Sequence, residues 1–112
     1  MPLLPSLKEK KRYVAFEVIS KEKFSFNQVK KAVDEALLKY IGLLGAGKAG
    51  MQILPEKYNQ NRGLIRINHK FTDYLKASFA LISKINNQKV VVRSLGTSGI
   101  LKKAEHKYLR GE

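Results

Sequence analysis

The sequence predicts an α+β fold in which two helices cover one face of a four-stranded antiparallel sheet. Three observations support this prediction. Apolar residues alternate with period two over residues 12–20, a pattern typical of a strand buried on one face. A capping box and a one-sided apolar stripe follow over residues 25–44, as in an amphipathic helix. Residues 51–95 then contain further strand and helix patterns, separated by turn-forming residues.

The first strand and the helix after it carry the clearest signals. The core-facing side of the strand is formed by apolar residues two apart, namely Val14, Phe16 and Val18. We expect Ser25 to cap the helix, because Gln28 lies three residues later and completes a capping box. The inward stripe of the helix consists of Val29, Val33, Ala36, Leu37, Tyr40, Ile41 and Leu44. Gly45 and Gly47 are predicted to end the helix.

The remaining elements are predicted as strands over residues 51–58, 63–68 and 89–95, a helix over residues 70–84, and a short helix after residue 99. Pro55 indicates that the strand containing it is an edge strand, and Asn68 is the expected cap of the second long helix. Asn86 and Asn87 are expected to turn the chain. The order β-α-β-β-α-β with a C-terminal helix is that of a ferredoxin-like or RRM-like sandwich.

The length and composition favour one domain inside the cell. A chain of 112 residues has room for a single core, which we place at residues 12–110 after a flexible basic arm over residues 1–11. The absence of cysteine excludes disulfides and thiolate-bound metals. The N-terminal segment lacks the apolar run of a secretory signal, and no segment has the length of a membrane span. We therefore expect a cytoplasmic protein without a membrane partner.

The charge is strongly positive. Lys and Arg number 22 against 9 Asp and Glu, which gives a net charge of +13. Between Glu56 and Glu105 the only acidic residue is Asp73. Such a surface attracts polyanions, and nucleic acid is the commonest of these for a soluble protein. The alternative is that the charge serves solubility alone.

The inward residues predicted for the later strands are Ile65, Ile67, Val90 and Val92. Burying them together with those of the first strand leaves polar residues on the sheet face that the two long helices do not cover. They are Tyr13, Glu17, Arg66, Asn68, Lys89 and Arg93. An RRM that stacks bases carries aromatic residues on its central strands, and here only Tyr13 is near such a position. This face is therefore expected to contact the RNA backbone and to recognise the shape of the RNA, not its bases. The alternative for Tyr13 is that it packs under the terminal helix.

Two glycine-rich segments have features of phosphate-binding loops. Residues 42–49 fit most of the P-loop pattern, but Ala49 replaces the hydroxyl residue that binds magnesium, and the segment closes a helix instead of opening one. Residues 93–99 form a different kind of segment, which joins the end of the last predicted strand to a basic helix and contains two glycines and three hydroxyl residues. Its backbone N–H groups suit a phosphate oxygen, although the loop also fits a simple helix cap.

The sequence contains no clear catalytic motif. There are two histidines, no cysteine, and no carboxylate cluster at the spacing of an acid-base pair or a metal site. We therefore expect the isolated chain to have no activity of its own. Two alternatives stay open at this point: an enzyme of ferredoxin-like fold that uses His69 as a base, and a generic module that binds structured RNA.

Four segments resemble the archaeal ribonuclease P protein component 2 family, and the similarity runs from about Leu4 to Leu109. They are Arg12–Val18, Gly63–Arg66, Phe79–Ile82 and Val91–Gly99, the last followed by lysines. Within the last segment, the part from Arg93 to Gly99 is the most specific to the family. Ile100 departs from the family pattern, where threonine is expected in many relatives.

The resemblance implies a role in a ribonucleoprotein that removes the 5′ leader from precursor tRNA. In that family the RNA subunit holds the catalytic magnesium, so this chain would be a non-catalytic subunit without a cofactor of its own. Its implied partners are the ribonuclease P RNA, protein component 3 and the other ribonuclease P proteins. Pairs with component 3 would associate into a heterotetramer through this subunit, and precursor tRNA would be contacted indirectly.

The predicted role is electrostatic bracing of the RNA, in which basic side chains neutralise crowded phosphates. The residues predicted to bind RNA are Lys10, Lys11, Arg12, Arg66, Arg93, Ser94, Ser98, Lys102, Lys103 and Lys107. The apolar side of the terminal helix and residues 40–55 are the predicted protein-contact surfaces.

Overall fold

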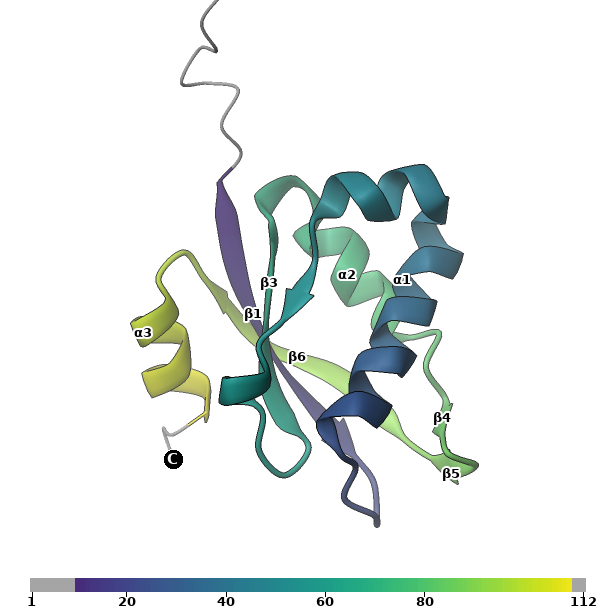
Figure 1. Cartoon of the computed structure of the whole chain (residues 1–112). Helices are drawn as coiled ribbons and strands as arrows, with labels where there is room; N and C mark the ends of the chain where they lie inside the picture. Colours follow the sequence, from purple (N-terminus) through teal and green to yellow (C-terminus); the bar gives the residue numbers. More distant parts are fainter. Residues whose placement is uncertain (1–9, 110–112) are drawn as a thin grey trace, which may run out of the picture.

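The computed structural model describes residues 10–109 of the chain (Figure 1). Its strands are β1 (Lys11–Ile19), β2 (Gln52–Ile53), β3 (Arg62–Asn68), β4 (Lys84–Ile85), β5 (Gln88–Lys89) and β6 (Val91–Ser98). Its helices are α1 (Phe26–Ala49), α2 (Thr72–Phe79) and α3 (Leu101–Ala104), with short helical turns η2 (Pro55–Lys57), η3 (His69–Phe71) and η4 (Glu105–Leu109). Most of the predicted N-terminal arm lies outside the described residues, and Lys11 already belongs to β1.

A four-stranded antiparallel sheet in the order β2-β3-β1-β6 forms the centre of the molecule. Helices α1 and α2 lie on one side of this sheet, and α3 lies on the other (Figure 1). Successive side chains of a strand point to opposite faces, so the alternation in β1 divides its residues between the two sides. The predicted α+β sandwich with a C-terminal helix is confirmed.

The core between the sheet and the two long helices contains the residues that the alternation predicts. The buried strand residues are Val14, Phe16, Val18, Ile65, Ile67 and Val92, with Val90 just before β6. Helix α1 adds Val29, Val33, Ala36 and Leu37. Full burial of an aliphatic or phenylalanine side chain contributes about 1.5–3 kcal/mol, so this cluster is the main source of stability.

Helix α1 begins as predicted. The Ser25 hydroxyl accepts a hydrogen bond from the N–H of Gln28 (3.3 Å), and the Gln28 side-chain oxygen accepts one from the N–H of Ser25 (2.9 Å). Both halves of the capping box are therefore present. This arrangement satisfies backbone donors that a helix start would otherwise leave without partners.

The end of α1 differs from the prediction. Gly45 and Gly47 lie inside the helix, and the chain leaves helical geometry earlier, at Gly42 (φ 80°, ψ 172°). The helix then resumes in a new direction (Figure 1) and ends at Gly50, whose left-handed conformation (φ 58°) suits glycine. The change of direction removes Leu44 from the predicted inward stripe, and its side chain is 75% exposed.

The second long helix is shorter than predicted. Asn68 is a cap as expected, because its side chain accepts a hydrogen bond from the N–H of Lys70 (3.0 Å). The first turn, however, is the 3-10 turn η3, and α2 ends at Phe79. Residues 80–83 form a loop, from which Ile82 still reaches the core.

Asn86 and Asn87 turn the chain within a separate small hairpin of β4 and β5. Both residues adopt positive φ values (53° and 66°), which a tight two-residue hairpin turn requires. The hairpin takes Lys89 out of the four-stranded sheet, so the predicted position of Lys89 on the sheet face is wrong. The fourth strand of that sheet begins at Val91 instead.

Strand β6 continues through the segment predicted to be a loop. Ser94 pairs with Phe16, and Gly96 pairs with Ala15, so Leu95 is an extra residue in β6. Such a bulge bends a strand and strengthens its twist while pairing continues on both sides. The prediction that the strand ends at Leu95 and that residues 96–99 form a loop is therefore wrong, because the strand runs to Ser98.

Only Gln52 and Ile53 of the strand predicted over residues 51–58 pair with β3. Strand β2 is an edge strand, as Pro55 indicated, and Pro55 itself begins η2. Proline has no N–H to give to a strand ladder, but it suits the first position of a helical turn.

Candidate nucleic-acid interface

The sheet face opposite α1 and α2, called the open face below, carries three rows of side chains that run across β3, β1 and β6. In order from the start of β1 they are Arg66–Tyr13–Ser98, Leu64–Ala15–Gly96 and Arg62–Glu17–Arg93. Residues directly opposite one another in a sheet point to the same side, so each row is a physical neighbourhood. Two polar rows thus flank one apolar row.

The terminal helix packs on the apolar row. Ala104 is fully buried in a second core cluster together with Ala15, Leu64 and Leu54. The residues packed around this cluster are Tyr13, Leu95, Leu101, Tyr108 and Leu109. Most of the apolar side of this helix, which is a predicted protein-contact surface, therefore packs against the sheet of its own chain. Tyr13 packs under the helix, which is the second of the two arrangements expected for it, so it offers no base-stacking platform.

Two contacts fix the position of this helix. A side chain at Gly96 would overlap the ring of Tyr108, so only glycine lets the ring lie directly on β6. Lys57 of η2 forms an ion pair with Glu105 of η4 (3.1 Å). As a result the helix separates Arg66 from Arg93, which lie on the same face but four residues apart along β1, or about 13 Å.

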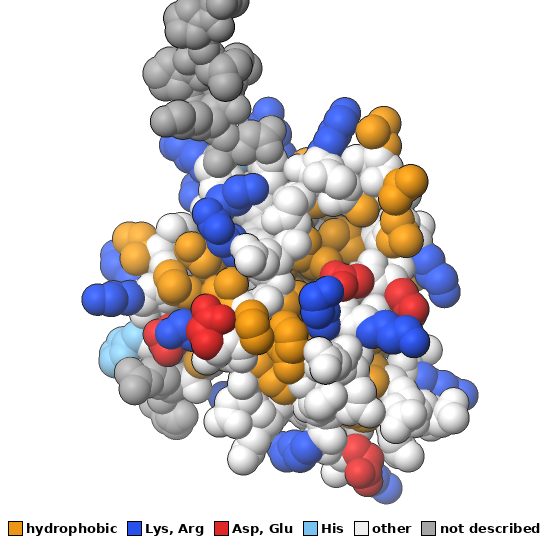
Figure 2. All heavy atoms as spheres, viewed as in Figure 1, with side chains coloured by type: hydrophobic (Ala, Val, Ile, Leu, Met, Phe, Trp, Pro, Cys, Tyr) orange, Lys and Arg blue, Asp and Glu red, His pale blue; other side chains and the backbone are white. Residues whose placement is uncertain are grey.

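Several of the predicted RNA-binding residues gather where β1 begins. Lys10 and Arg66 are exposed, and the guanidinium of Arg12 reaches Gly99 at the end of β6. Lys11, in β1 itself, reaches toward the end of α1. Figure 2 shows Lys and Arg side chains beside the start of β1. The strand register therefore brings residues from distant parts of the sequence into one basic area.

The predicted position of Asn68 on the open face is wrong. Asn68 is fully buried, because its side chain turns to cap η3 instead of lying on the open face. Ser94 pairs with Phe16 and shares its core-facing side of the sheet, while Arg93 points to the open face. The bulge at Leu95 then places Ser98 back on the open face. Ser94 and Ser98 cannot contact one RNA segment from the same surface.

The remaining predicted residues lie on the terminal segment. The Ser98 hydroxyl accepts a hydrogen bond from the N–H of Ile100 (3.1 Å), so it already has a local partner. Lys102, Lys103 and Lys107 are exposed, and the Nζ of Lys107 lies 5.6 Å from the centre of the Tyr108 ring. Their exposure makes these three lysines available to an anionic partner.

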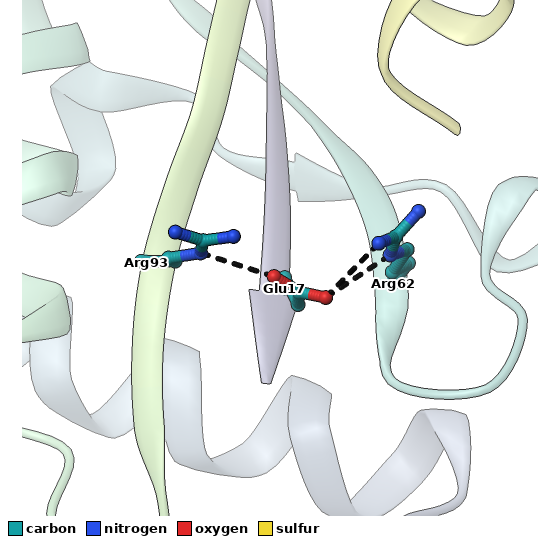
Figure 3. Close-up of polar contacts among 3 residues, drawn as sticks. All are labelled: Glu17, Arg62 and Arg93. Carbon is teal, nitrogen blue, oxygen red and sulfur yellow. Dashed lines mark hydrogen bonds and ion pairs between the residues drawn. The ribbon is translucent and has the colours of Figure 1, made fainter. Parts of the chain in front are cut away.

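The third row forms an ion-pair cluster, shown in Figure 3. The Arg93 Nε donates to one oxygen of Glu17 (3.0 Å), and the Arg62 Nε donates to the other (3.2 Å). Burial by itself raises the pKa of Glu17, but the hydrogen bonds and charges of Arg93 and Arg62 outweigh it, and the pKa is lower than usual. Glu17 is therefore a carboxylate at neutral pH, shared between two arginines.

Arg62 is a member of this site that the sequence analysis above does not predict. Glu17 and Arg93 lie on the open face as predicted, whereas Arg62 precedes the predicted third strand and belongs to β3 in the structure. The alternation could have found it, because Arg62, Leu64 and Arg66 have the same parity in β3.

His69 lies in η3, and its backbone N–H donates to the carbonyl of Lys10 (2.8 Å). Within residues 10–109, no group of three or more histidine, aspartate or glutamate side chains is arranged to hold a metal ion. Over the same range, no helix combines the length and apolar character needed to cross a membrane.

An apolar patch lies at the far end of α1, away from the open face. It consists of the exposed side chains of Tyr40, Leu43, Leu44 and Tyr74, and Tyr40 and Tyr74 contact each other with ring centres 6.2 Å apart. Figure 2 shows hydrophobic side chains at this corner of the molecule. Tyr40 is predicted to face the core and is exposed instead, so it forms an apolar surface together with Leu43 and Leu44.

The model of the Rpp14/Pop5 family matches residues 12–109 of this chain. A protein of Thermococcus gammatolerans called ribonuclease P protein component 2 is 36% identical over 107 residues, covering 96% of this chain and 89% of that protein. The protein of the same name from Methanosarcina mazei is 34% identical over 110 residues, covering 98% of this chain and 93% of that one.

A chain in a cryo-EM structure of yeast ribonuclease MRP has a similar fold. Its TM-score is 0.67 over 92% of this chain and 88% of that chain, with 14% sequence identity. The similarity extends over nearly the whole of both chains, and at this identity it concerns the fold alone.

Proposed function

Because the chain belongs to the Rpp14/Pop5 family, we propose that it is a subunit of ribonuclease P that binds and braces the catalytic RNA during removal of the 5′ leader from precursor tRNA. The observation that supports bracing is the set of exposed basic residues around the open face. They come from Lys10 just before β1 and from β3, β6, α3 and η4, with no aromatic stacking platform among them. Such a surface suits phosphates better than bases.

The physical basis is neutralisation of phosphate charge. Folding brings phosphates of an RNA close together, and lysine or arginine at those places lowers the amount of magnesium that the RNA needs. Each phosphate contact also releases counterions, which adds about 0.7–0.9 to the slope of log K against log salt concentration. The chain then acts as a non-catalytic subunit, and magnesium is held by the RNA.

The proposed assembly follows the family. In it the chain pairs with ribonuclease P protein component 3, two such pairs associate through this subunit, and precursor tRNA is reached indirectly. The proposed location is the cytoplasm. The apolar patch on α1 lies away from the open face, so protein contacts there would leave the basic surface free for RNA.

Reconstituted pre-tRNA cleavage tests the bracing role. Arg93→Ala combined with Lys102→Ala removes two predicted phosphate contacts, one on each side of the β6–α3 connection. We expect the salt slope for binding ribonuclease P RNA to fall by about 1.4–1.8 and the affinity to fall roughly tenfold or more. The magnesium concentration required for half-maximal cleavage should rise.

The matched control is Lys31→Ala combined with Lys39→Ala. Both lysines are exposed on α1, on the other side of the sheet, and their removal changes the net charge equally. Equal effects of the two double variants would mean that only net charge matters. Unchanged RNA affinity and magnesium requirement in the first variant would exclude bracing through this surface. Equal capture of mixed transcripts by the wild-type protein would indicate a generic RNA-binding module.

A further inference from the structure

The Arg62–Glu17–Arg93 row is built differently from the other basic surfaces of the described chain. The side chains of Arg62 and Arg93 are 44% and 59% exposed, whereas that of Glu17 is 19% exposed. The carboxylate therefore lies beneath the two guanidinium groups and holds one on each of its oxygens. Exposed arginines usually sample many rotamers, and here a shared anchor orients both.

The two guanidinium groups keep hydrogen-bond donors for a further partner. Each guanidinium has five N–H groups, and Glu17 uses the Nε of Arg93 and the Nε and Nη2 of Arg62. In Figure 3 no dashed line joins the carboxylate to the two terminal nitrogens of Arg93 or to one terminal nitrogen of Arg62. Their arrangement suits an oxyanion, because the planar guanidinium matches the spacing of phosphate oxygens.

The charge of the row also fits one phosphodiester. Two arginines and one carboxylate leave a net charge of one positive unit. A phosphodiester carries one negative unit, so a single group balances the row. Without Glu17, the same arginines would repel each other and attract any polyanion more strongly.

The next row on the same face is apolar and exposed. Ile19 pairs with Val91 directly beyond Glu17 and Arg93, and both side chains are exposed. An open hollow of about 640 Å³ also borders Glu17, Ile19 and Arg62. A nucleotide has this combination of properties, with a charged phosphate next to the apolar faces of its base and sugar.

We propose that the Arg62–Glu17–Arg93 row binds one phosphodiester of an RNA strand, with the adjoining nucleotide against Ile19 and Val91. Glu17 is then a positioning residue that makes the site selective for a correctly placed phosphate. This proposal rests on the RNA-binding function proposed above. It adds a second RNA contact, separated by the terminal helix from the basic area at the start of β1.

Glu17→Gln tests the positioning role against Asp34→Asn. Both changes raise the net charge by one unit and remove a carboxylate from an ion pair, but Asp34 pairs with Lys30 on α1, away from the open face. Binding would be measured by fluorescence anisotropy with ribonuclease P RNA and with poly(U). We expect Asp34→Asn to raise the affinity for each RNA slightly and to leave the ratio of the two affinities unchanged.

Glu17→Gln should change the ratio of the two affinities. Glutamine has a single acceptor oxygen, so it can hold one arginine and frees the other. Poly(U) binding should become several times tighter through the added charge, while binding of ribonuclease P RNA stays equal or weakens. We expect the preference for ribonuclease P RNA to fall roughly tenfold. The same ratio in the Glu17 and Asp34 variants would overturn the positioning role.

A charge-neutral variant gives an independent readout if Glu17→Gln does not fold. Arg62→Lys combined with Arg93→Lys keeps every charge but removes the planar donor groups. It should lose preference for ribonuclease P RNA while binding poly(U) as before. Unchanged preference in this variant would also count against the site.

The salt slope tests the number of phosphates. If Arg62 and Arg93 hold one phosphodiester together, Arg62→Ala, Arg93→Ala and the double variant should each lower the slope by the same amount, about 0.7–0.9. A loss about twice as large in the double variant would mean two separate phosphates. Failure of the wild-type protein to prefer ribonuclease P RNA over poly(U) would instead contradict the proposed function itself.

Discussion

At the scale of single residues, Asn61 is the best example of a side chain that sets local structure. Its side-chain oxygen accepts from the N–H of Phe24 (2.9 Å), and its amide group donates to the carbonyl of Glu22 (2.8 Å). Its own carbonyl accepts from the N–H of Val18 (2.7 Å). Asn61 is buried and has a positive φ of 67°. It therefore ties the turn before β3 to the segment that leads into α1.

Asn61→Ala should lower the free energy of unfolding by about 2–4 kcal/mol, because the buried N–H of Phe24 and the partly buried carbonyl of Glu22 would lose their partners and alanine disfavours positive φ. Urea denaturation would measure the loss. Gln60→Ala is the matched control, since Gln60 also has a positive φ (47°) but is exposed. Similar losses in the two variants would show that backbone conformation, and not the side-chain hydrogen bonds, is what matters.

At the scale of elements, the C-terminal helix decides how much of the sheet is accessible. Its own intrinsic stability is low, because α3 spans only Leu101–Ala104 and short helices depend on tertiary packing. The helix lies on the sheet because Ala15 and Gly96 have small or no side chains and, with the bulged Leu95, form an apolar surface on which it can pack closely. Small residues in β1 and β6 therefore control access to the open face.

Gly96→Ala should destabilise this docking. The new methyl group would overlap the Tyr108 ring, and we expect a loss of about 1–2 kcal/mol in the free energy of unfolding. In a Tyr108→Ala background the same change should cost much less, so the two effects should not add. Gly47→Ala is the control, because a Cβ there meets no atom within 4 Å and lies within α1. Additive losses for Gly96 and Tyr108 would contradict the direct contact.

At the scale of the whole molecule, the net charge of +13 has two opposite consequences. The folded chain repels itself, because its positive charges are brought closer together than in the unfolded state. The same charges attract RNA phosphates. Both effects are electrostatic and weaken with ionic strength, but one opposes folding and the other promotes binding.

We therefore expect sodium chloride to act in opposite directions on stability and on binding. Raising it from about 50 to 300 mM shortens the Debye length from about 14 to 6 Å, which should raise the melting temperature of the free protein. Over the same range the affinity for RNA should fall steeply, with several phosphate contacts contributing to the slope. Thermal denaturation and anisotropy titrations in the same buffers would measure both. A melting temperature that falls with salt would mean that attractive pairs such as Glu17 with its arginines outweigh the repulsion.

The parts of the fold that depend on local sequence were predictable. The period-two pattern around Val14, Phe16 and Val18 gives the buried face of β1, and Ser25 with Gln28 gives the start of α1. The end of α1 was not predictable, because any of several closely spaced glycines can end a helix. Gly42 rather than Gly45 interrupts it, since the choice depends on how the following segment packs.

The sequence by itself determined the class of the fold, the inward residues of β1 and β3, and a basic surface suited to a polyanion. The tertiary structure alone decided that Leu95 is a bulge, that the terminal helix divides the open face, and that Glu17 lies between Arg62 and Arg93. The physical reason is the range of the interactions involved. Periodicity and caps arise between residues a few positions apart, whereas strand register and cross-strand ion pairs join residues that only the folded chain brings together.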